Sequence, residues 1–428
     1  MQLEKIRAGS ECKGAGKQAV IEYRQEKLSV NLKKLGRMKI CILGAGAVGS
    51  HIAEALYQHG AGLYGGRVTL VDHDGVDGSN YTKQSGLYGP EDLGRPKAIA
   101  LARRINRIVG NEGYFIPMNT DICELGEAFF SGFDVIFIAV DNFRARLHIN
   151  KMVRQSQHTP VVITTGTGTD KAESICLDMK RLCTRCLWSE SWLEDVTGPK
   201  SCRFAYEAQE KAGVIPTSKL LSALAGLLAF SQMNALAEGH EEVLNTRKEA
   251  FVSPTGIDVY TSRPLPKQNC PDCAVSAPKS VVSMEGSVFD MTLDTFLKQV
   301  RKRTGWDTVW ALGDGFLLHD YCPRCGAKKE VYRPARWLNR EQLICVQCRE
   351  QLPQQDLPAV EFVNAYSMDS EPRLREMKLS ELGMRPWGYI QVEKELDFWD
   401  GCQAEGMVFT LDEQMSDNGY LIGEEEDT

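Results

Sequence analysis

Short apolar runs alternate with amphipathic segments in the first part of the chain. Four segments are predicted to be buried strands of a parallel sheet: residues 40–43 and 133–140, which are almost entirely apolar, and residues 67–71 and 161–165, which are mostly apolar. Three segments between or beside these runs have the spacing of apolar positions that predicts helices: residues 48–59, 96–108 and 142–153. Strands that alternate with helices in this way predict an α/β fold with a doubly wound, mostly parallel sheet.

The alternation weakens after Thr165, which indicates a change in organisation. Residues 166–275 contain a further helix, expected over 219–237, and form a crossover region. Gly, Ser and Pro near 276–287 indicate a linker. We therefore expect four parts. They are an N-terminal helical extension over residues 1–37, a main domain over 38–275, a smaller C-terminal domain over 288–414 and an acidic tail over 415–428.

The composition narrows the possible environment and partners. Hydrophobic residues make up 43% and charged residues 25%, as in soluble globular proteins. The net charge of −7 argues against a nucleic-acid partner, because phosphate binding needs a positive surface. The N-terminus lacks the apolar core of a secretory signal, and the most apolar stretch, residues 220–230, is too short to cross a membrane. We expect a cytoplasmic protein that binds no nucleic acid and no membrane.

Three glycines predict a phosphate-binding turn. Gly44, Gly46 and Gly49 have the spacing G-x-G-x-x-G directly after one predicted strand and before a predicted helix. Such glycines let the backbone turn tightly and approach a phosphate at the positive end of the helix. Asp72 ends the next predicted strand, where a carboxylate can accept hydrogen bonds from ribose hydroxyls. A Rossmann-like NAD or FAD protein has the same features, as does a tight turn without a ligand, so the glycines leave the nucleotide open.

The residues after Asp72 favour one class of nucleotide enzyme. The segment VDHDGVDGSNYTKQSGLYGPEDLGRPKA contains Asn80, Lys83-Gln84 and Gly94-Arg95-Pro96-Lys97. The later segment IFIAVDNFRARLHIN contains Asp141 directly after an apolar strand. This combination of motifs resembles the ThiF/MoeB and ubiquitin-activating enzyme superfamily, over about residues 38–275.

The resemblance implies a site for ATP and Mg²⁺. It assigns Asp72 to the ribose, Asn80, Lys83 and Lys97 to the phosphates, and Asp141 to magnesium, with Gln84 orienting the phosphates. The family usually has arginine in place of Lys83, and a lysine keeps the charge but loses the bidentate fork. Alternatively, both lysines are solvated surface residues. The nucleotide-binding set is Gly44, Gly46, Gly49, Asp72, Asn80, Lys83, Gln84, Lys97 and Asp141.

The family also uses an arginine that precedes the first strand, sometimes from the other subunit. Arg24 is the first candidate here and Arg37 the next. Because family members are usually dimers with composite sites, the resemblance implies a homodimer.

Eight of the 14 cysteines form four C-x-x-C pairs, which indicate metal sites rather than disulfides in a chain of this class. The pairs at 183/186 and 270/273 resemble the structural zinc site of MoeB-like proteins and would bind zinc in the crossover region. The pairs at 322/325 and 345/348 have the internal spacing of a zinc ribbon. We expect two Zn²⁺ per chain; the alternative is reduced free cysteines. The ligands are Cys183, Cys186, Cys270, Cys273, Cys322, Cys325, Cys345 and Cys348.

Cys202 is a candidate nucleophile. It lies in GPKSCRFAYEAQEKAGV, between the first cysteine pair and the predicted helix. In ThiF-like and ubiquitin-activating enzymes a loop cysteine accepts the activated acyl group, and Lys200 and Arg203 would favour its thiolate. The alternative is a non-catalytic loop cysteine, since MoeB-type adenylation proceeds without a thioester. The implied catalytic set is Cys202, Lys97, Lys83, Asp141 and Arg24.

Four functions remain open at this level. The first is adenylation of the C-terminal carboxylate of a ubiquitin-like protein, followed by thioester formation and transfer to a conjugating enzyme. Its C-terminal zinc ribbon would bind partners, as in activating enzymes of bacterial antiviral conjugation operons. The second is activation of a sulfur-carrier protein for thiamine or molybdopterin synthesis. The third is an NAD- or FAD-dependent oxidoreductase, which leaves Asn80, Lys83, Lys97 and Asp141 unexplained. The fourth is a non-catalytic scaffold, which retention of Lys97 and Asp141 disfavours.

Overall fold

A computed structural model describes most of the chain. The described residues are 32–78, 84, 86–189, 218–275, 277–322, 324–338, 344–349, 360–395 and 406–414. They form two compact units. The first contains the described residues up to Cys123 and from Phe130 to Ala277, and the second contains Glu124–Phe129 and the described residues from Pro278 onward.

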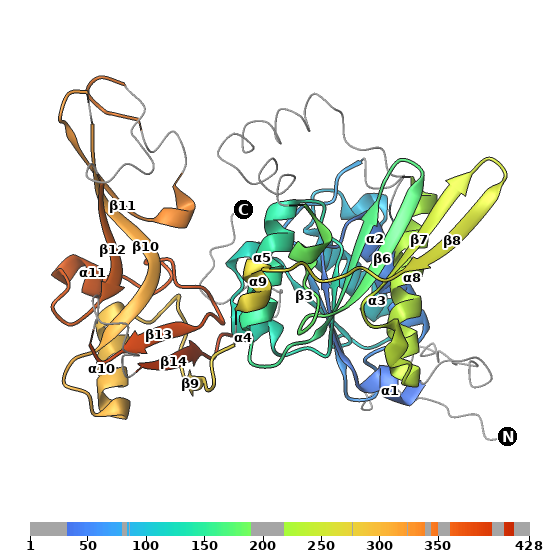
Figure 1. Ribbon diagram of the computed structural model, residues 1–428, viewed down its shortest axis with the longest axis horizontal. Helices are drawn as coiled ribbons and strands as arrows, with labels where there is room; N and C mark the ends of the chain where they lie inside the picture. The colour runs from blue at the N-terminus through green and yellow to red at the C-terminus, as the bar shows by residue number, and fades with distance from the viewer. Residues whose placement is uncertain are drawn as a thin grey trace. The chain divides into compact units, whose positions relative to one another are not determined.

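The first unit is built on an eight-stranded sheet in the order β3-β2-β1-β4-β5-β6-β7-β8. Figure 1 shows strands β6, β7 and β8 of this sheet side by side. The pairings from β3 to β5 are parallel, and those from β5 to β8 are antiparallel. The strands are β1 Lys39–Leu43, β2 Arg67–Val71, β3 Phe115–Met118, β4 Val135–Ile138, β5 Val161–Thr167, β6 Lys171–Asp178, β7 Thr246–Ser253 and β8 Gly256–Ser262. The predicted mostly parallel α/β sheet is confirmed, and β3, β6, β7 and β8 add to the four predicted strands.

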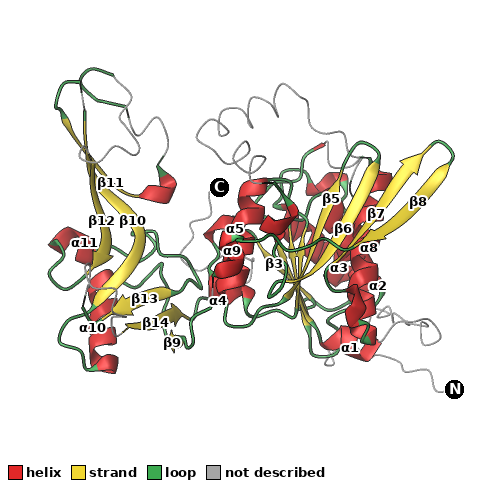
Figure 2. Ribbon diagram, in the orientation of Figure 1, coloured by secondary structure: helices red, strands yellow, loops and turns green. Residues whose placement is uncertain are grey.

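Helices cover both faces of this sheet (Figure 2). All four predicted helices are present, as α2, α3, α5 and α8. The helices of the unit are α1 Leu32–Arg37, α2 Ala47–Gln58, α3 Lys97–Val109, α5 Phe143–Gln155, α8 Lys219–Glu238 and α9 Pro271–Ala274, while α4 Glu127–Phe130 spans the boundary of the units. Short 3₁₀ turns are η2 Pro90–Asp92, η3 Ile122–Glu124, η4 Thr184–Leu187 and η5 Glu241–Val243.

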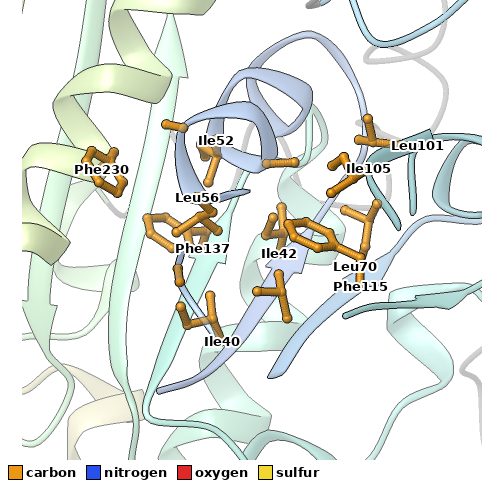
Figure 3. Packing of buried hydrophobic residues seen from close by; sticks show 14 of the residues in the cluster. Ile40, Ile42, Ile52, Leu56, Leu70, Leu101, Ile105, Phe115, Phe137 and Phe230 are labelled. Atoms are coloured by element: carbon orange, nitrogen blue, oxygen red, sulfur yellow. The ribbon is translucent and has the colours of Figure 1, made fainter. Parts of the chain in front are cut away.

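The core of the first unit lies between the parallel strands and helices α2, α3 and α8. Ile40 and Ile42 project from the same face of β1, because side chains two residues apart in a strand lie on one side. They belong to the cluster that contains Leu56 of α2, Phe137 of β4 and Phe230 of α8 (Figure 3). Each such side chain contributes about 1.5–3 kcal/mol on full burial, so this layer holds β1 and its neighbours firmly.

Helix α8 contains the apolar stretch 220–230, which was predicted to be too short to cross a membrane. Among the described residues it is the one helix long and apolar enough to cross a membrane, with a mean hydropathy of 1.5 over its most apolar window. Half of that window is buried, and α8 packs closely on α2. A Cβ on Gly226 would lie 2.9 Å from the His51 Cβ, so glycine is needed at this contact. Such packing is typical of a core helix in a globular unit.

The second unit has its own sheet and core. The strand order is β11-β10-β13-β14-β9, and β12 also pairs with β10. Its apolar cluster includes Phe296, Phe316 and Phe409. Strand β9 begins inside the segment 276–287 that was predicted to be a linker. The elements are β9 Val282–Met284, α10 Leu293–Thr304, β10 Trp310–Tyr321, β11 Lys328–Pro334, η6 Ala335–Trp337, β12 Val360–Tyr366, α11 Pro372–Glu376, β13 Ile390–Glu393 and β14 Gly406–Leu411.

Residues 124–129 are an unexpected part of the second unit. The Gly126 N–H donates to the Pro386 carbonyl at 3.0 Å, and a Glu127 carboxylate oxygen accepts from the Tyr389 N–H at 3.0 Å. A Cβ on Gly126 would lie 2.3 Å from the Gly388 Cα. The second unit therefore includes a short segment that lies far from the rest of it in sequence.

Candidate functional site

The topology of the first unit predicts where a ligand binds. The chain passes from β1 to β2 and β3 on one side of the sheet, then returns to β4 and β5 on the other side of β1. Ligands of open α/β sheets bind at the carboxyl ends of the strands where the order reverses. In this chain that position is the crevice between the carboxyl ends of β1 and β4.

The three glycines at this position have different roles. Gly44 follows β1 with φ +98, and a Cβ on it would lie 2.8 Å from the Ala139 carbonyl oxygen. A Cβ on Gly49 would lie 1.8 Å from the Gly44 carbonyl oxygen. A Cβ on Gly46, the N-cap of α2, would meet nothing within 4 Å. The fold therefore requires the first and third glycines, and the middle one borders open space at the positive end of α2.

Asp72 ties the glycine turn to the end of β2. One carboxylate oxygen accepts from the Ala45 N–H at 2.6 Å and the other from the Asp74 N–H at 2.8 Å. Burial raises the pKa of Asp72, against the lowering effects of the Ala45 N–H and the Lys97 charge. A structural role for this carboxylate was not evident in the sequence. Its oxygens retain acceptor capacity for a ribose hydroxyl, which stays a prediction.

Lys97 is held beside Asp72 by a second aspartate. It is the first residue of α3, is 9% exposed, and its Nζ donates to a carboxylate oxygen of Asp74 at 2.9 Å. Burial lowers the pKa of Lys97, but the Asp74 hydrogen bond and the charges of Asp72, Asp74 and Asp77 together raise it above its usual value. Lys97 is therefore a fixed cation near the carboxyl ends of the strands, and not a freely solvated surface lysine.

Two further residues near the glycine turn had no predicted structural role. Asp74 lies two positions after Asp72, and the Asp-x-Asp spacing was the available signal. Tyr88 is buried, and its hydroxyl donates to the Ala45 carbonyl at 2.7 Å. Burial raises the pKa of Tyr88, as do the charges of Asp72 and Asp92, so the phenol stays protonated. The turn is thus fixed on two sides.

Asp141 lies on the other side of the glycine turn. It follows β4 and immediately precedes Asn142, whose side chain caps α5 by accepting from the Ala145 N–H at 2.8 Å. Asp141 is exposed. Because β1 pairs with β2 on one side and β4 on the other, the turn lies between Asp72 and Asp141. An exposed carboxylate here is available as an oxygen ligand for Mg²⁺.

The remaining predicted residues are only partly described. Gln84 is buried, and its Oε1 has no hydrogen-bond partner among the described residues. Arg37 ends α1 just before β1 begins, so it lies at the amino end of β1, whereas the glycine turn follows the carboxyl end. It therefore does not reach the crevice of its own chain. Three more predicted side chains and the candidate nucleophile lie outside the described residues: Arg24, Asn80, Lys83 and Cys202.

The first two cysteine pairs meet in the first unit. The Cys183 Sγ lies 3.8 Å from the Cys186 Sγ and 3.6 Å from the Cys270 Sγ, and the Cys186 and Cys273 sulfurs are 3.6 Å apart. A tetrahedron of 2.3 Å Zn–S bonds has sulfurs roughly 3.8 Å apart. Burial, followed by the charge of Cys186, raises the pKa of Cys183, so its thiolate would need a compensating positive charge such as that of Zn²⁺. The donor set fits a structural zinc.

The other two pairs meet in the second unit. Cys322 and Cys325 lie in the turn between β10 and β11, and Cys345 and Cys348 approach them with Sγ–Sγ distances of 3.5 Å for 322–348 and 3.6 Å for 325–345. Hydrogen bonds, the Cys348 N–H first and the Gln347 N–H next, lower the pKa of Cys345 to about 6, which favours the thiolate that zinc requires. This set also fits a tetrahedral zinc site.

Comparison with known proteins finds one matching family model and several relatives with similar names. The model described as "ThiF family" matches residues 20–275. An ATP-dependent ubiquitin transferase-like protein Cap2 from Escherichia coli is 25% identical over 256 residues, which cover 56% of this chain and 41% of that protein. The human ubiquitin-like modifier-activating enzyme 7 is 36% identical over 142 residues, which cover 32% of this chain and 14% of that protein.

Two further similarities come from bacterial proteins. A sulfur carrier protein adenylyltransferase from Thermus thermophilus is 31% identical over 121 residues, which cover 28% of this chain and 42% of that protein. The crystal structure of E. coli MccB with ATP has a TM-score of 0.45 and 19% identity, covering 57% of this chain and 68% of that chain. The chain spans less than half the length of each of the three curated relatives.

The glycine turn allows a test of ligand approach with matched substitutions. Gly49→Ala should destabilise the fold by about 3 kcal/mol or more, because its Cβ overlaps the Gly44 carbonyl. Gly46→Ala should cost about 1 kcal/mol, as an N-cap change, yet weaken Mg-ATP binding by filling the open space. Urea unfolding and calorimetric titration measure both effects. Wild-type ATP affinity in Gly46→Ala would exclude a nucleotide at this turn.

Metal analysis tests both cysteine sets. Purified protein should contain two zinc ions per chain, and Cys186→Ser or Cys345→Ser should each reduce the content to one, because each removes one of four thiolates. Cys123→Ser, outside both sets, serves as the control and should retain two. A wild-type content of one or none by mass spectrometry would contradict the ligand assignment.

Proposed function

Because the chain belongs to the ThiF family, whose model matches residues 20–275, we propose that it adenylates the C-terminal carboxylate of a ubiquitin-like protein, using ATP and Mg²⁺. A carboxylate oxygen of the partner attacks the α-phosphorus of ATP. The bond to the β-phosphate bridging oxygen breaks, and the products are an acyl-adenylate and pyrophosphate.

One observation carries this proposal. The glycine turn, with open space at Gly46, lies between a buried aspartate–lysine pair on one side and exposed Asp141 on the other. Attack by a carboxylate on a triphosphate brings negative charges together, so catalysis requires positioning and neutralisation of charge. A cation and a metal-ligating carboxylate on opposite sides of one phosphate-binding turn meet that need.

Each residue has a distinct proposed task. Lys97 uses one N–H for Asp74 and keeps two donors for phosphate oxygens. Asp141 binds magnesium, which supplies positive charge at the phosphates. Asp72 holds the turn and accepts from the ribose. The roles proposed for Asn80, Lys83, Gln84 and Arg24 rest on the family motif.

A hydride-transferring oxidoreductase fits this site less well. The dinucleotide-binding function explains the glycines and Asp72. It gives no task to Lys97, which is fixed beside the turn, or to exposed Asp141. The charge arrangement therefore favours a triphosphate with its metal.

The step after adenylation separates the two main candidates. In the first, the Cys202 thiolate attacks the acyl carbonyl carbon, the bond to the AMP oxygen breaks, AMP leaves, and a conjugating enzyme accepts the acyl group. The similarity to an ATP-dependent ubiquitin transferase-like protein supports this candidate. From the family resemblance we further propose an antiviral conjugation system in which the second unit binds partners. In the second, the activated group is a sulfur carrier, as the similarity to a sulfur carrier adenylyltransferase suggests. We also propose that the enzyme is a cytoplasmic homodimer.

Loss of the proposed metal ligand tests the adenylation step. Asp141→Ala should lower partner-dependent ATP–pyrophosphate exchange by roughly 100-fold or more, because charge at the phosphates is no longer neutralised. Glu112→Ala is the control and should behave as wild type. It removes an exposed carboxylate in the loop before β3, at the amino ends of the strands and so away from the crevice. Normal exchange in Asp141→Ala would remove Asp141 from the site.

The fate of the acyl group is tested at Cys202. Cys202→Ala should leave pyrophosphate exchange unchanged and abolish a thiol-sensitive adduct with the partner on non-reducing gels, because only thioester formation needs the sulfur. Cys402→Ala is the matched control and should retain the adduct. Absence of any adduct in the wild type, with exchange intact, would favour the sulfur-carrier function.

A further inference from the structure

Helix α5 extends from the proposed magnesium ligand to the first cysteine cluster, defined as Cys183, Cys186, Cys270 and Cys273. We propose that Asn150 and Arg154 make this helix a rigid link between the two, so that the zinc-loaded cluster sets the affinity of the crevice for Mg-nucleotide. This inference rests on the proposed function for the role of Asp141. Asn150 and Arg154 are positioning residues, since they act through the helix and not on the nucleotide.

The amino end of α5 is fixed to the sheet. Asn142 caps the helix through the Ala145 N–H, one residue after Asp141. The half-buried Arg146 guanidinium donates to the Val140 carbonyl at 2.5 Å, to the Thr164 hydroxyl at 2.7 Å and to the Thr165 carbonyl at 2.8 Å. The backbone around Asp141 and the first turn of α5 therefore move together. Any displacement of the helix changes the position of Asp141.

The other half of α5 is fixed to both cysteine pairs by one side chain. Asn150 is fully buried. Its Nδ2 donates to an Asp272 carboxylate oxygen at 2.5 Å, and Asp272 lies between Cys270 and Cys273. Its Oδ1 accepts from the Thr184 N–H at 2.9 Å and the Thr184 hydroxyl at 2.8 Å, and Thr184 lies between Cys183 and Cys186. A single amide thus contacts both segments that the zinc would join.

Arg154, one turn further along α5, adds contacts to the same segment. Its Nε donates to the Asp272 carbonyl at 3.1 Å, and one Nη donates to the Cys273 carbonyl at 2.6 Å and the Val275 carbonyl at 3.1 Å. The other Nη donates to the Met179 carbonyl. A guanidinium can make several such bonds at once because its donors form a rigid fork. The carboxyl half of the helix is therefore anchored to the cluster by its side chains.

These contacts explain how the cluster influences a distant carboxylate. A helix of 13 residues is only marginally stable alone, so its order depends on the groups it packs against. Asn150 is nine residues from Asp141, which is roughly 14 Å along a helix. Zinc draws four thiolates together and so fixes the Thr184 and Asp272 segments. Linkage then requires that zinc and Mg-nucleotide each tighten the binding of the other.

A reversal of one hydrogen bond tests the link. Asn150→Asp places a carboxylate against the Asp272 carboxylate while still accepting from Thr184, so the helix should lose its anchor. Asn150→Asp combined with Asp272→Asn restores a donor and an acceptor at the same positions. Lys151→Ala, an exposed change at the next residue of α5, is the control. If Asn150→Asp fails to fold, Asn150→Ser carries the same test with a milder loss.

Two measurements are made in zinc-containing buffer. The first is the calorimetric Kd for Mg²⁺ with an ATP analogue that has a methylene group between the α- and β-phosphates. The second is hydrogen–deuterium exchange in peptides covering residues 141–147, without nucleotide. We expect Asn150→Asp to raise the Kd about tenfold and to speed exchange in those peptides, as for other residues that orient metal ligands. The double variant should recover most of both effects, and Lys151→Ala should match the wild type.

Failure of this inference is distinguishable from failure of the proposed function. Wild-type affinity and wild-type exchange in Asn150→Asp would overturn the link, and so would a double variant no better than Asn150→Asp. A wild-type protein that does not bind the analogue would instead refute the proposed function. In that case the exchange rates alone would still show whether the cluster orders the amino end of α5.

Discussion

The hydrogen bond from the Ala45 N–H to the buried Asp72 carboxylate determines the shape of the crevice. It joins the turn after β1 to the end of β2, and Asp74 accepts from Lys97 next to it. Burial of a carboxylate is costly unless its oxygens are satisfied, and Asp72 meets this requirement with two backbone N–H groups. The turn is therefore preorganised before any ligand arrives, which is the condition for efficient electrostatic catalysis.

The polar groups of the first unit fall into two kinds. Asp72 and Asn150 are buried and Arg146 is half-buried, and each makes several hydrogen bonds that fix the ends of strands and helices. Asp141 and the backbone at Gly46 face open surroundings, and Asp141 accepts no hydrogen bond from the described residues. Polar groups with hydrogen-bond partners stabilise the fold. Groups without them in the crevice between the carboxyl ends of β1 and β4, where the strand order reverses, are available to bind a ligand. This division supports the assignment of Asp141 to the ligand side.

The sequence predicted the parallel half of the sheet, and the glycine turn, Asp72 and Asp141 lie at the carboxyl ends of its strands. Apolar runs identify β1 and β4, and mostly apolar segments identify β2 and β5, because strands buried on both faces carry few polar residues. It did not predict β8, in which all seven residues are exposed, so that no buried face leaves a pattern in the sequence. Residues 124–129 were also unpredictable, since their contacts are with residues more than 200 positions away.

The same reasoning explains why spacing identified the two four-cysteine clusters but not their supporting residues. A C-x-x-C pair is local, so its two thiols converge in any fold that forms the turn. Asn150 and Arg154 contact the first cluster only after β4, α5 and the crossover region have assembled, and their separation from Asp272 exceeds 100 residues. Such supporting contacts orient metal ligands and tune the properties of the metal site. In this protein they also connect the cluster to the helix that begins next to Asp141, so the supporting residues connect the two candidate sites of the first unit.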